Sequence, residues 1–236
     1  MDWRQATDYA FAPRLDAAGW AWQFLRRNPE YRADYRWFIA TWQHLEADYG
    51  VPPLRDFFRW KQDPRAWRAE SEIACGAEIC PGEGDRILIE CWMGAKWGFR
   101  KFPVDPAIDF PEDLTWREQP GAVIPLAPGE AAPDDETGTT LTFDLALPLD
   151  LQLEAARRHL AAARHKLAQR GRAPALNLRQ GAPRWQTCLR LLDGLEAGAP
   201  LADIGAILDL ADPETAAKEA GAILARGYLR ILRLPD

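Results

Sequence analysis

The sequence predicts an α+β protein that is mainly α-helical. Apolar residues recur at helical spacing in the first third of the chain and again after residue 149, whereas they alternate in short stretches between residues 70 and 103. We therefore expect a helical, aromatic N-terminal unit, a small antiparallel β middle, and a long C-terminal helix followed by a three-helix module. The corresponding domains are residues 1–68, 69–148 and 149–236, with a linker at 127–139.

The N-terminal unit is unusually aromatic, since residues 1–68 hold seven of the eleven tryptophans. Two helices are expected there, one over about residues 16–27 and one from Pro29 to Tyr49, and Gly50 ends the second. A small helical unit needs large side chains to bury enough apolar area, so the tryptophans are interpreted as core residues. The alternative is an aromatic face that binds another protein.

The middle of the chain is acidic and changes to a period of two. Residues 69–150 carry 17 acidic and 5 basic residues. Apolar residues alternate on both sides of the sequence PGEGD, which predicts a β-hairpin made by residues 73–79 and 87–91. Further short strands are expected over residues 97–102 and 141–147.

No metal, cofactor or catalytic site is expected. Cys75, Cys80 and Cys91 lack the spacing of paired Cys-x-x-Cys zinc ligands, and their alternation makes them buried structural residues on strands. His159 and His165 are six residues apart, so they lie on different faces of a helix. The chain contains neither a phosphate-binding glycine-rich loop nor a nucleophile elbow, so we expect no enzymatic activity.

The composition predicts a cytoplasmic protein. Four cysteines are too few and too irregularly spaced for a disulfide scaffold. No run approaches eighteen consecutive apolar residues, so neither a membrane-spanning helix nor a membrane partner is expected. The N-terminus lacks the layout of a signal peptide, and no apolar segment follows Arg26-Arg27 that would make this pair an export signal.

The C-terminal part begins with a helix expected from Asp150 to Gln169 and continues with three short amphipathic helices. Gly198 ends the first of these helices, and Pro200 opens the second. The sequence Asp212-Pro213-Glu214 caps the third helix, which is expected to end at Gly227. This spacing is typical of a helix-turn-helix, although a helical bundle with no role in DNA binding has the same pattern.

A basic stretch runs into this module. Residues 151–190 hold nine basic residues and one acidic residue, and such local positive charge favours phosphate contacts. The alternative is a helix whose basic side chains only face the solvent. Double-stranded DNA is the expected partner, with a recognition helix over about Pro213 to Arg226, and a homodimer is expected because one small module covers a short site. The expected DNA-binding residues are Arg157, Arg158, Arg164, Arg179, Arg184, Lys218 and Arg226.

The expected recognition helix is poorly equipped to bind DNA by itself. Carboxylates on or just before it outnumber its basic residues, and a carboxylate near a phosphate opposes binding. These carboxylates belong to Asp209, Asp212, Glu214 and Glu219. The outward face of the helix is mostly small, which suits docking against another helix at least as well as base readout. The residues of this alternative partner-binding face are Glu214, Lys218, Gly221, Ala222 and Ala225.

Two stretches of the chain resemble known families. The string WAWQFLRRNPEYRADY, from Trp20 to Tyr35, resembles the N-terminal domain of proteobacterial proteins described as transcriptional-regulator-like. The stretch from about Thr142 to Tyr228, with the motifs APRW, LLDGLEAGA and RGY, resembles the helix-turn-helix variant domain of activators and antiactivators of conjugative element transfer. Together these stretches lie toward the two ends of the chain.

The resemblance implies a cytoplasmic regulator of horizontally mobile DNA. Activators of this type bind promoter DNA, whereas antiactivators of this type bind the activator instead. We therefore predict a DNA-binding transcriptional regulator of mobile or conjugative element genes. The alternative is a protein-binding antiactivator or regulator that uses the same helix-turn-helix-like module as a docking surface.

Overall fold

The computed structural model describes residues 1–73, 85–118, 123, 126, 130, 138–169 and 177–235. The described chain is mainly helical with one small antiparallel sheet, which confirms the predicted fold class. Its contacts group into two compact units, Met1–Gln119 with Asn177–Asp236 as the first and Pro120–Leu176 as the second. The three sequence domains were drawn on composition rather than on contacts, and that division stays a prediction.

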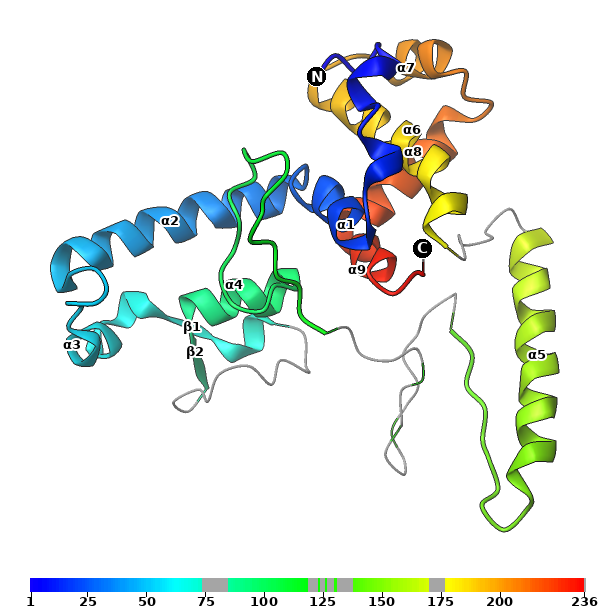
Figure 1. Cartoon of the computed structure of the whole chain (residues 1–236), viewed down its shortest axis with the longest axis horizontal. Coiled ribbons are helices and arrows are strands. Elements are labelled where there is room, and N and C mark those ends of the chain that lie inside the picture. Colours follow the sequence, from blue (N-terminus) through cyan, green and yellow to red (C-terminus); the bar gives the residue numbers. More distant parts are fainter. Residues whose placement is uncertain are drawn as a thin grey trace. The chain divides into compact units, whose positions relative to one another are not determined.

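The elements are labelled in Figure 1. The helices of the described ranges are α1 (Ala17–Leu25), α2 (Pro29–Tyr49), α3 (Phe57–Gln62), α4 (Ile89–Trp97), α5 (Leu149–Gln169), α6 (Leu178–Glu196), α7 (Leu201–Leu208), α8 (Pro213–Ala222) and α9 (Tyr228–Ile231). The strands are β1 (Trp67–Ala69) and β2 (Arg86–Leu88), and a π-helical turn (Ile223–Gly227) joins α8 to α9.

Side-chain caps explain where the first two helices begin. The Asp16 carboxylate accepts a hydrogen bond from the Gly19 amide at 2.7 Å, which caps α1. The Asn28 side-chain oxygen accepts from the amides of Glu30 and Tyr31, which caps α2 at Pro29. Both predicted N-terminal helices are therefore confirmed, the second with the same bounds.

The first unit has a core that joins the N-terminal and C-terminal parts of the sequence. Helix α1 lies beside α9 and against α6 (Figure 1). The rings of Trp20 on α1 and Trp185 on α6 meet edge to face with centroids 5.3 Å apart, and both side chains are buried. Tyr228, at the start of α9, is fully buried and donates its hydroxyl hydrogen to the Trp97 carbonyl oxygen. The C-terminal helices thus depend on the N-terminal residues for part of their core.

A buried ion pair fixes α1 to α6. Arg27 Nε lies 2.6 Å from Asp193 Oδ1, and Arg27 Nη2 lies 3.0 Å from Asp193 Oδ2. Arg27 Nη1 donates to the backbone and side-chain oxygens of Gln23, so the guanidinium is well satisfied although its side chain is only 4% exposed. The Tyr9 hydroxyl also donates to Asp193 Oδ2, and burial together with this bond raises the pKa of Tyr9.

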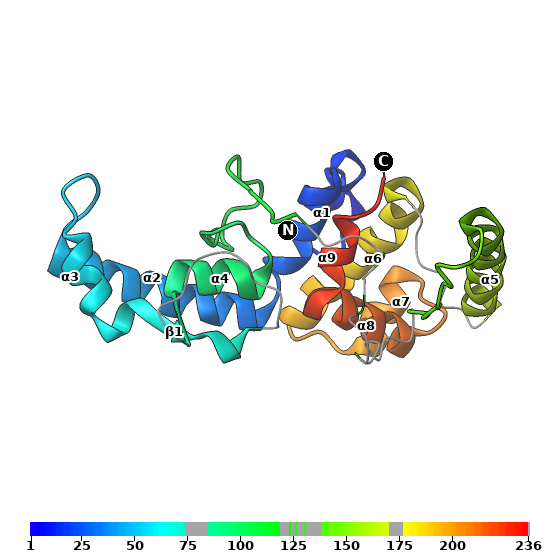
Figure 2. The ribbon, with the colours of Figure 1, turned by 90° about the horizontal axis from the view of Figure 1, so that it is seen from below.

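Helices α2, α3 and α4 with the two strands form an aromatic layer of the first unit. Figure 2 shows α4 lying along α2, and β1 pairs antiparallel with β2. Trp60 of α3 is fully buried and meets the ring of Trp42 edge to face at 4.8 Å. The Arg55 guanidinium lies over both rings. The N-terminal tryptophans that are buried, as the core interpretation predicted, are Trp3, Trp20, Trp22, Trp60 and Trp67.

The predicted strands of the middle part are largely wrong. Residues 89–97 form helix α4, and seven of its nine residues are buried. A helix that is buried on most sides is apolar all round, so the sequence shows no amphipathic stripe that would mark it as a helix. Phe99 makes only an isolated bridge with Trp116, and the described residues 141–147 form no strand. At the second predicted hairpin strand, Arg86–Leu88 form β2, which pairs with β1, whereas the first predicted strand lies almost wholly outside the described residues.

Two cysteines and the predicted hairpin turn cannot be compared with the structure. Residues 74–84, with Cys75 and Cys80, and most of the linker at 127–139 lie outside the described residues. Cys91 is fully buried, as expected, but it lies on α4 rather than on a strand and is disulfide-bonded, which its spacing did not predict.

The predicted helices of the C-terminal part are present with shifted ends. Helix α5 confirms the expected helix from Asp150 to Gln169. Helix α6 begins at Leu178, capped by Asn177, so the basic stretch is already helical from that residue on. Gly227 does not end the third helix, because the π-helical turn carries the chain on into α9. None of the described helices is long and apolar enough to cross a membrane.

Candidate nucleic-acid interface

Helices α6, α7 and α8 pack against one another and form the predicted three-helix module. Helix α7 approaches the start of α8 so closely that a Cβ atom on Gly205 would lie 2.4 Å from Pro213 Cγ. Asp209 ends α7 in the left-handed conformation with φ 52°, and the Leu210 amide donates to the Gly205 carbonyl oxygen at 2.9 Å. The turn between α7 and α8 is therefore tight and defined by Gly205 and Asp209.

The Asp212 carboxylate caps the N-terminus of α8. Asp212 Oδ1 accepts from the Thr215 amide at 3.0 Å, and Asp212 Oδ2 accepts from the Thr215 hydroxyl at 2.6 Å. These bonds lower the pKa of Asp212 further below neutral, so its carboxylate is negatively charged at neutral pH. A fixed negative charge thus stands at the helix end that an anion would otherwise approach.

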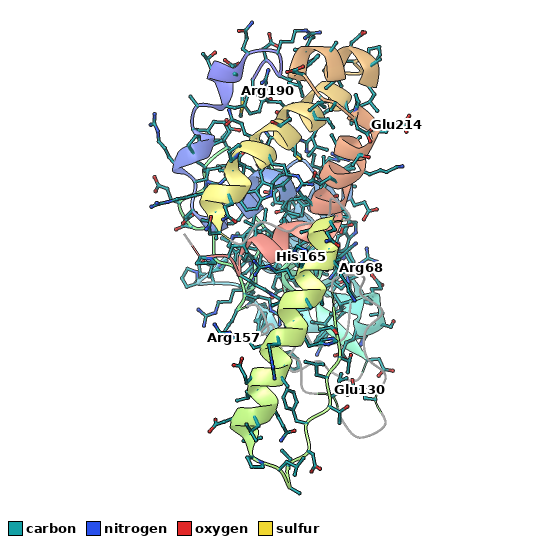
Figure 3. All side chains as sticks on the ribbon, turned by 90° about the vertical axis from the view of Figure 1, so that its right-hand side faces the viewer. Arg68, Glu130, Arg157, His165, Arg190 and Glu214 are labelled. Carbon is teal, nitrogen blue, oxygen red and sulfur yellow. The ribbon has the colours of Figure 1, made fainter. Side chains whose placement is uncertain are left out.

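The outward face of α8 is exposed, as its helical period predicted. Glu214 projects from the first turn (Figure 3), and the Gly221 position is open, since a Cβ atom there would meet nothing within 4 Å. No described neighbour therefore requires a glycine on this helix, where glycine is about 1 kcal/mol less favourable than alanine. The exposed residues of the predicted partner-binding face are Glu214, Lys218, Gly221, Ala222 and Ala225.

Some of the basic residues near α8 are bound within the unit. Arg184 Nε pairs with Glu219 Oε1 and so joins α6 to α8. This pair neutralises one of the carboxylates of α8, but it also reduces the charge that Arg184 offers to a phosphate. Arg190 donates to the backbone oxygens of Trp3 and Arg4, at 2.9 Å each, and so holds the N-terminal residues on α6.

Three basic residues of the module remain exposed without an ion pair to any described residue. Arg179 lies in the first turn of α6, Lys218 lies on α8, and Arg226 lies in the π-helical turn. Their guanidinium and ammonium groups are available to a ligand, which is the minimum that phosphate contacts require.

The remaining predicted DNA-binding residues lie on α5, in the second unit. Arg157, Arg158 and Arg164 are all exposed, and Figure 3 labels Arg157 on this helix. Arg170 and Arg172 lie outside the described residues. The prediction that α5 and α8 contact one DNA site together stays a prediction.

Sequence reasoning missed the residues that position the module. Asp193 is 166 residues from Arg27 and 184 from Tyr9, so no local spacing connects them. The sequence places Arg27 in the string WAWQFLRRNPEYRADY, but no local pattern connects it with Asp193.

Comparison with known proteins supports a regulatory role. Residues 2–49 match the family model of the Proteobacterial transcriptional regulator-like domain. No curated protein and no solved structure matches the chain. The matched segment spans α1 and α2 and contains Tyr9, Trp20 and Arg27, the side chains that contact α6. The segment that is similar to this family model thus packs, through α1, on the C-terminal module.

Proposed function

We propose that the protein is a DNA-binding transcriptional regulator that uses α7 and α8 as a helix-turn-helix and the basic residues of α5 and α6 for phosphate contacts. The observation that carries the proposal is the regulator-like segment at residues 2–49, which shares a core with the three-helix module. The proposal places the protein in the cytoplasm with its DNA and assigns it no enzymatic activity. Its target genes, from the resemblance described above, belong to a mobile or conjugative element.

The distribution of charge favours phosphate contacts over base contacts as the main source of affinity. Glu214 and the capping Asp212 occupy the end of α8 that reaches base edges in helix-turn-helix proteins. Arg179 and Lys218 are exposed and unpaired among the described residues, so they are suited to phosphates. Each phosphate contact adds about 0.9 to the slope of log affinity against log salt concentration.

Fluorescence anisotropy with DNA from the gene's own upstream region tests this proposal. Replacing Arg179→Ala together with Lys218→Ala is expected to lower the salt slope by about 2, one phosphate contact for each residue. The matched control is Arg36→Ala with Arg100→Ala, which removes two exposed positive charges from α2 and the loop after α4. Weak binding that ignores DNA sequence at moderate salt, unchanged by the first pair of substitutions, would contradict the proposal.

A second candidate function is a protein-binding regulator or antiactivator that docks through α8. The specific observation in its favour is the open space at Gly221 on a face of small, exposed residues. A small face allows the backbone of another helix to approach closely, whereas base readout needs long polar side chains.

A pull-down from the native host distinguishes the two functions. Ala222→Arg places a long charged side chain on the exposed face of α8 and is expected to abolish docking while it leaves DNA binding unchanged or stronger. Ala202→Arg, at an exposed position of α7, is the matched control and is expected to retain both. Recovery of the same partner proteins by both variants would refute docking through α8.

A further inference from the structure

Helix α5 carries apolar residues with a heptad period along its whole length. The positions alternate in steps of four and three residues, and they are Leu149, Leu153, Ala156, Leu160, Ala163 and Leu167. We call these six residues the α5 seam. A narrow seam with this period is typical of two helices that wrap around each other, whereas a helix on a globular core shows a wider stripe.

Within the second unit, no described residue buries the α5 seam. Leu149 is 52% exposed, Leu153 56% and Leu160 48%, and no residue of α5 is buried. In proteins most of the stability of a helix comes from packing of its apolar face, so the α5 seam is expected to have a partner surface.

We propose that the α5 seam pairs with the α5 seam of a second copy of this chain in antiparallel orientation. With the two-fold axis between Ala156 and Leu160, Leu153 faces Ala163 of the second copy and Ala156 faces Leu160 of the second copy. Every inner layer then combines one large and one small side chain. A parallel pair would stack leucine on leucine and alanine on alanine, which leaves the alanine layers underfilled.

Charge beside the seam favours the same orientation. Asp150, Arg157 and Arg164 share one flank of the seam, a heptad apart. The antiparallel arrangement places Asp150 opposite Arg164 of the second copy twice and Arg157 opposite Arg157 once, so the attractive contacts outnumber the repulsive one. A parallel arrangement would instead bring the basic C-terminal ends of both helices together, with Arg164 and Lys166 of each copy at one end. Arg158 lies on the opposite side of the helix and stays exposed in either case.

This self-association does not depend on DNA binding, and it supplies what a DNA-binding regulator needs. A two-fold pair of chains carries two copies of the module, which matches a site made of two half-sites.

Sedimentation velocity of the full chain over a concentration series tests the pairing. The wild-type chain is expected to sediment as a dimer, and Leu153→Glu is expected to weaken dimerisation at least about 100-fold, since a charge in the seam is left without water or a counter-ion. Leu151→Glu is the matched control, because Leu151 lies on the same helix, is 73% exposed and stands outside the seam. Circular dichroism checks that each variant keeps its helices. A monomeric wild type, or equal loss of dimer in both variants, would overturn the proposal.

Cysteine cross-linking tests the orientation. An equimolar mixture of Leu153→Cys and Ala163→Cys chains is expected to form a disulfide-linked heterodimer under mild oxidation. Leu153→Cys alone is expected not to link to itself beyond the wild-type background, because antiparallel pairing separates the two positions by about 15 Å along the axis. Efficient self-linking of Leu153→Cys would overturn the antiparallel arrangement.

Discussion

Removal of the Asp193 carboxylate is expected to destabilise the first unit strongly. Asp193 makes two contacts of 2.6 and 3.0 Å with the Arg27 guanidinium, whose side chain is only 4% exposed. In Asp193→Ala a buried charge loses its partner, which costs about 3–5 kcal/mol. Asp193 itself is 16% exposed, so water reaches part of the site and we expect a loss of about 3 kcal/mol in the free energy of unfolding. Urea unfolding followed by tryptophan fluorescence measures this loss.

The neighbouring ion pair of Arg32 with Glu196 provides the control. It joins the same two regions of the chain, but its side chains are 30% and 52% exposed, so Glu196→Ala is expected to cost at most about 1 kcal/mol. Replacing both buried partners, as Arg27→Met with Asp193→Leu, is expected to recover part of the stability because no charge is left buried. Equal losses in Asp193→Ala and Glu196→Ala would refute the inference that the buried pair holds α1 on α6.

Three further outcomes are expected. Gly205→Ala should lower the free energy of unfolding by about 1–3 kcal/mol in urea unfolding, because its Cβ atom would meet Pro213. Gly221→Ala should raise it by up to about 1 kcal/mol, because the space there is open. The opposite order of the two variants would contradict the described turn. Burial raises the pKa of Glu90 above its ordinary 4.5, so the folded state binds this proton more tightly than the unfolded state does. The free energy of unfolding should therefore fall as pH rises from 4.5 through the raised pKa. Glu90→Gln should remove that decrease, and a pH profile unchanged in this variant would refute the prediction. Burial raises the pKa of Cys188 to about 12, so its thiol should resist alkylation at pH 8 until the chain unfolds. Mass spectrometry measures the labelling. Rapid labelling of the folded chain would show that the Cys188 thiol is accessible.

Local signals in the sequence were sufficient for most of the helices. Asn28 with Pro29, and Asp212 with Pro213, mark the starts of α2 and α8 because a cap needs only residues within one turn. Helix α4 was missed since its sides are covered by other elements, so its burial follows from tertiary packing and leaves no period of its own. The continuation past Gly227 was missed because a π-helical turn accommodates this residue without ending the helix.

For the candidate interface, the sequence predicted which residues are exposed but not which residues pair with one another. The period of α8 correctly indicated which residues face outward, since exposure on a helix repeats every turn. The ion pair of Arg184 with Glu219 was not predictable, because it depends on how α6 crosses α8. Because Arg184 and Glu219 neutralise each other, a count of charges along the chain overstates both the positive charge before the module and the negative charge on α8.

The shared core of the first unit has a consequence for how the protein is made. Tyr9 and Trp20 leave the ribosome early, but Asp193 and Trp185, which they contact, are added only after the whole middle of the chain. Until then Trp20 lacks the α6 surface that it packs against, and exposed apolar surface of this kind promotes aggregation. A C-terminal fragment that starts at residue 149 would lack the same contacts, so its failure to fold or to bind DNA would say nothing about the module in the full chain.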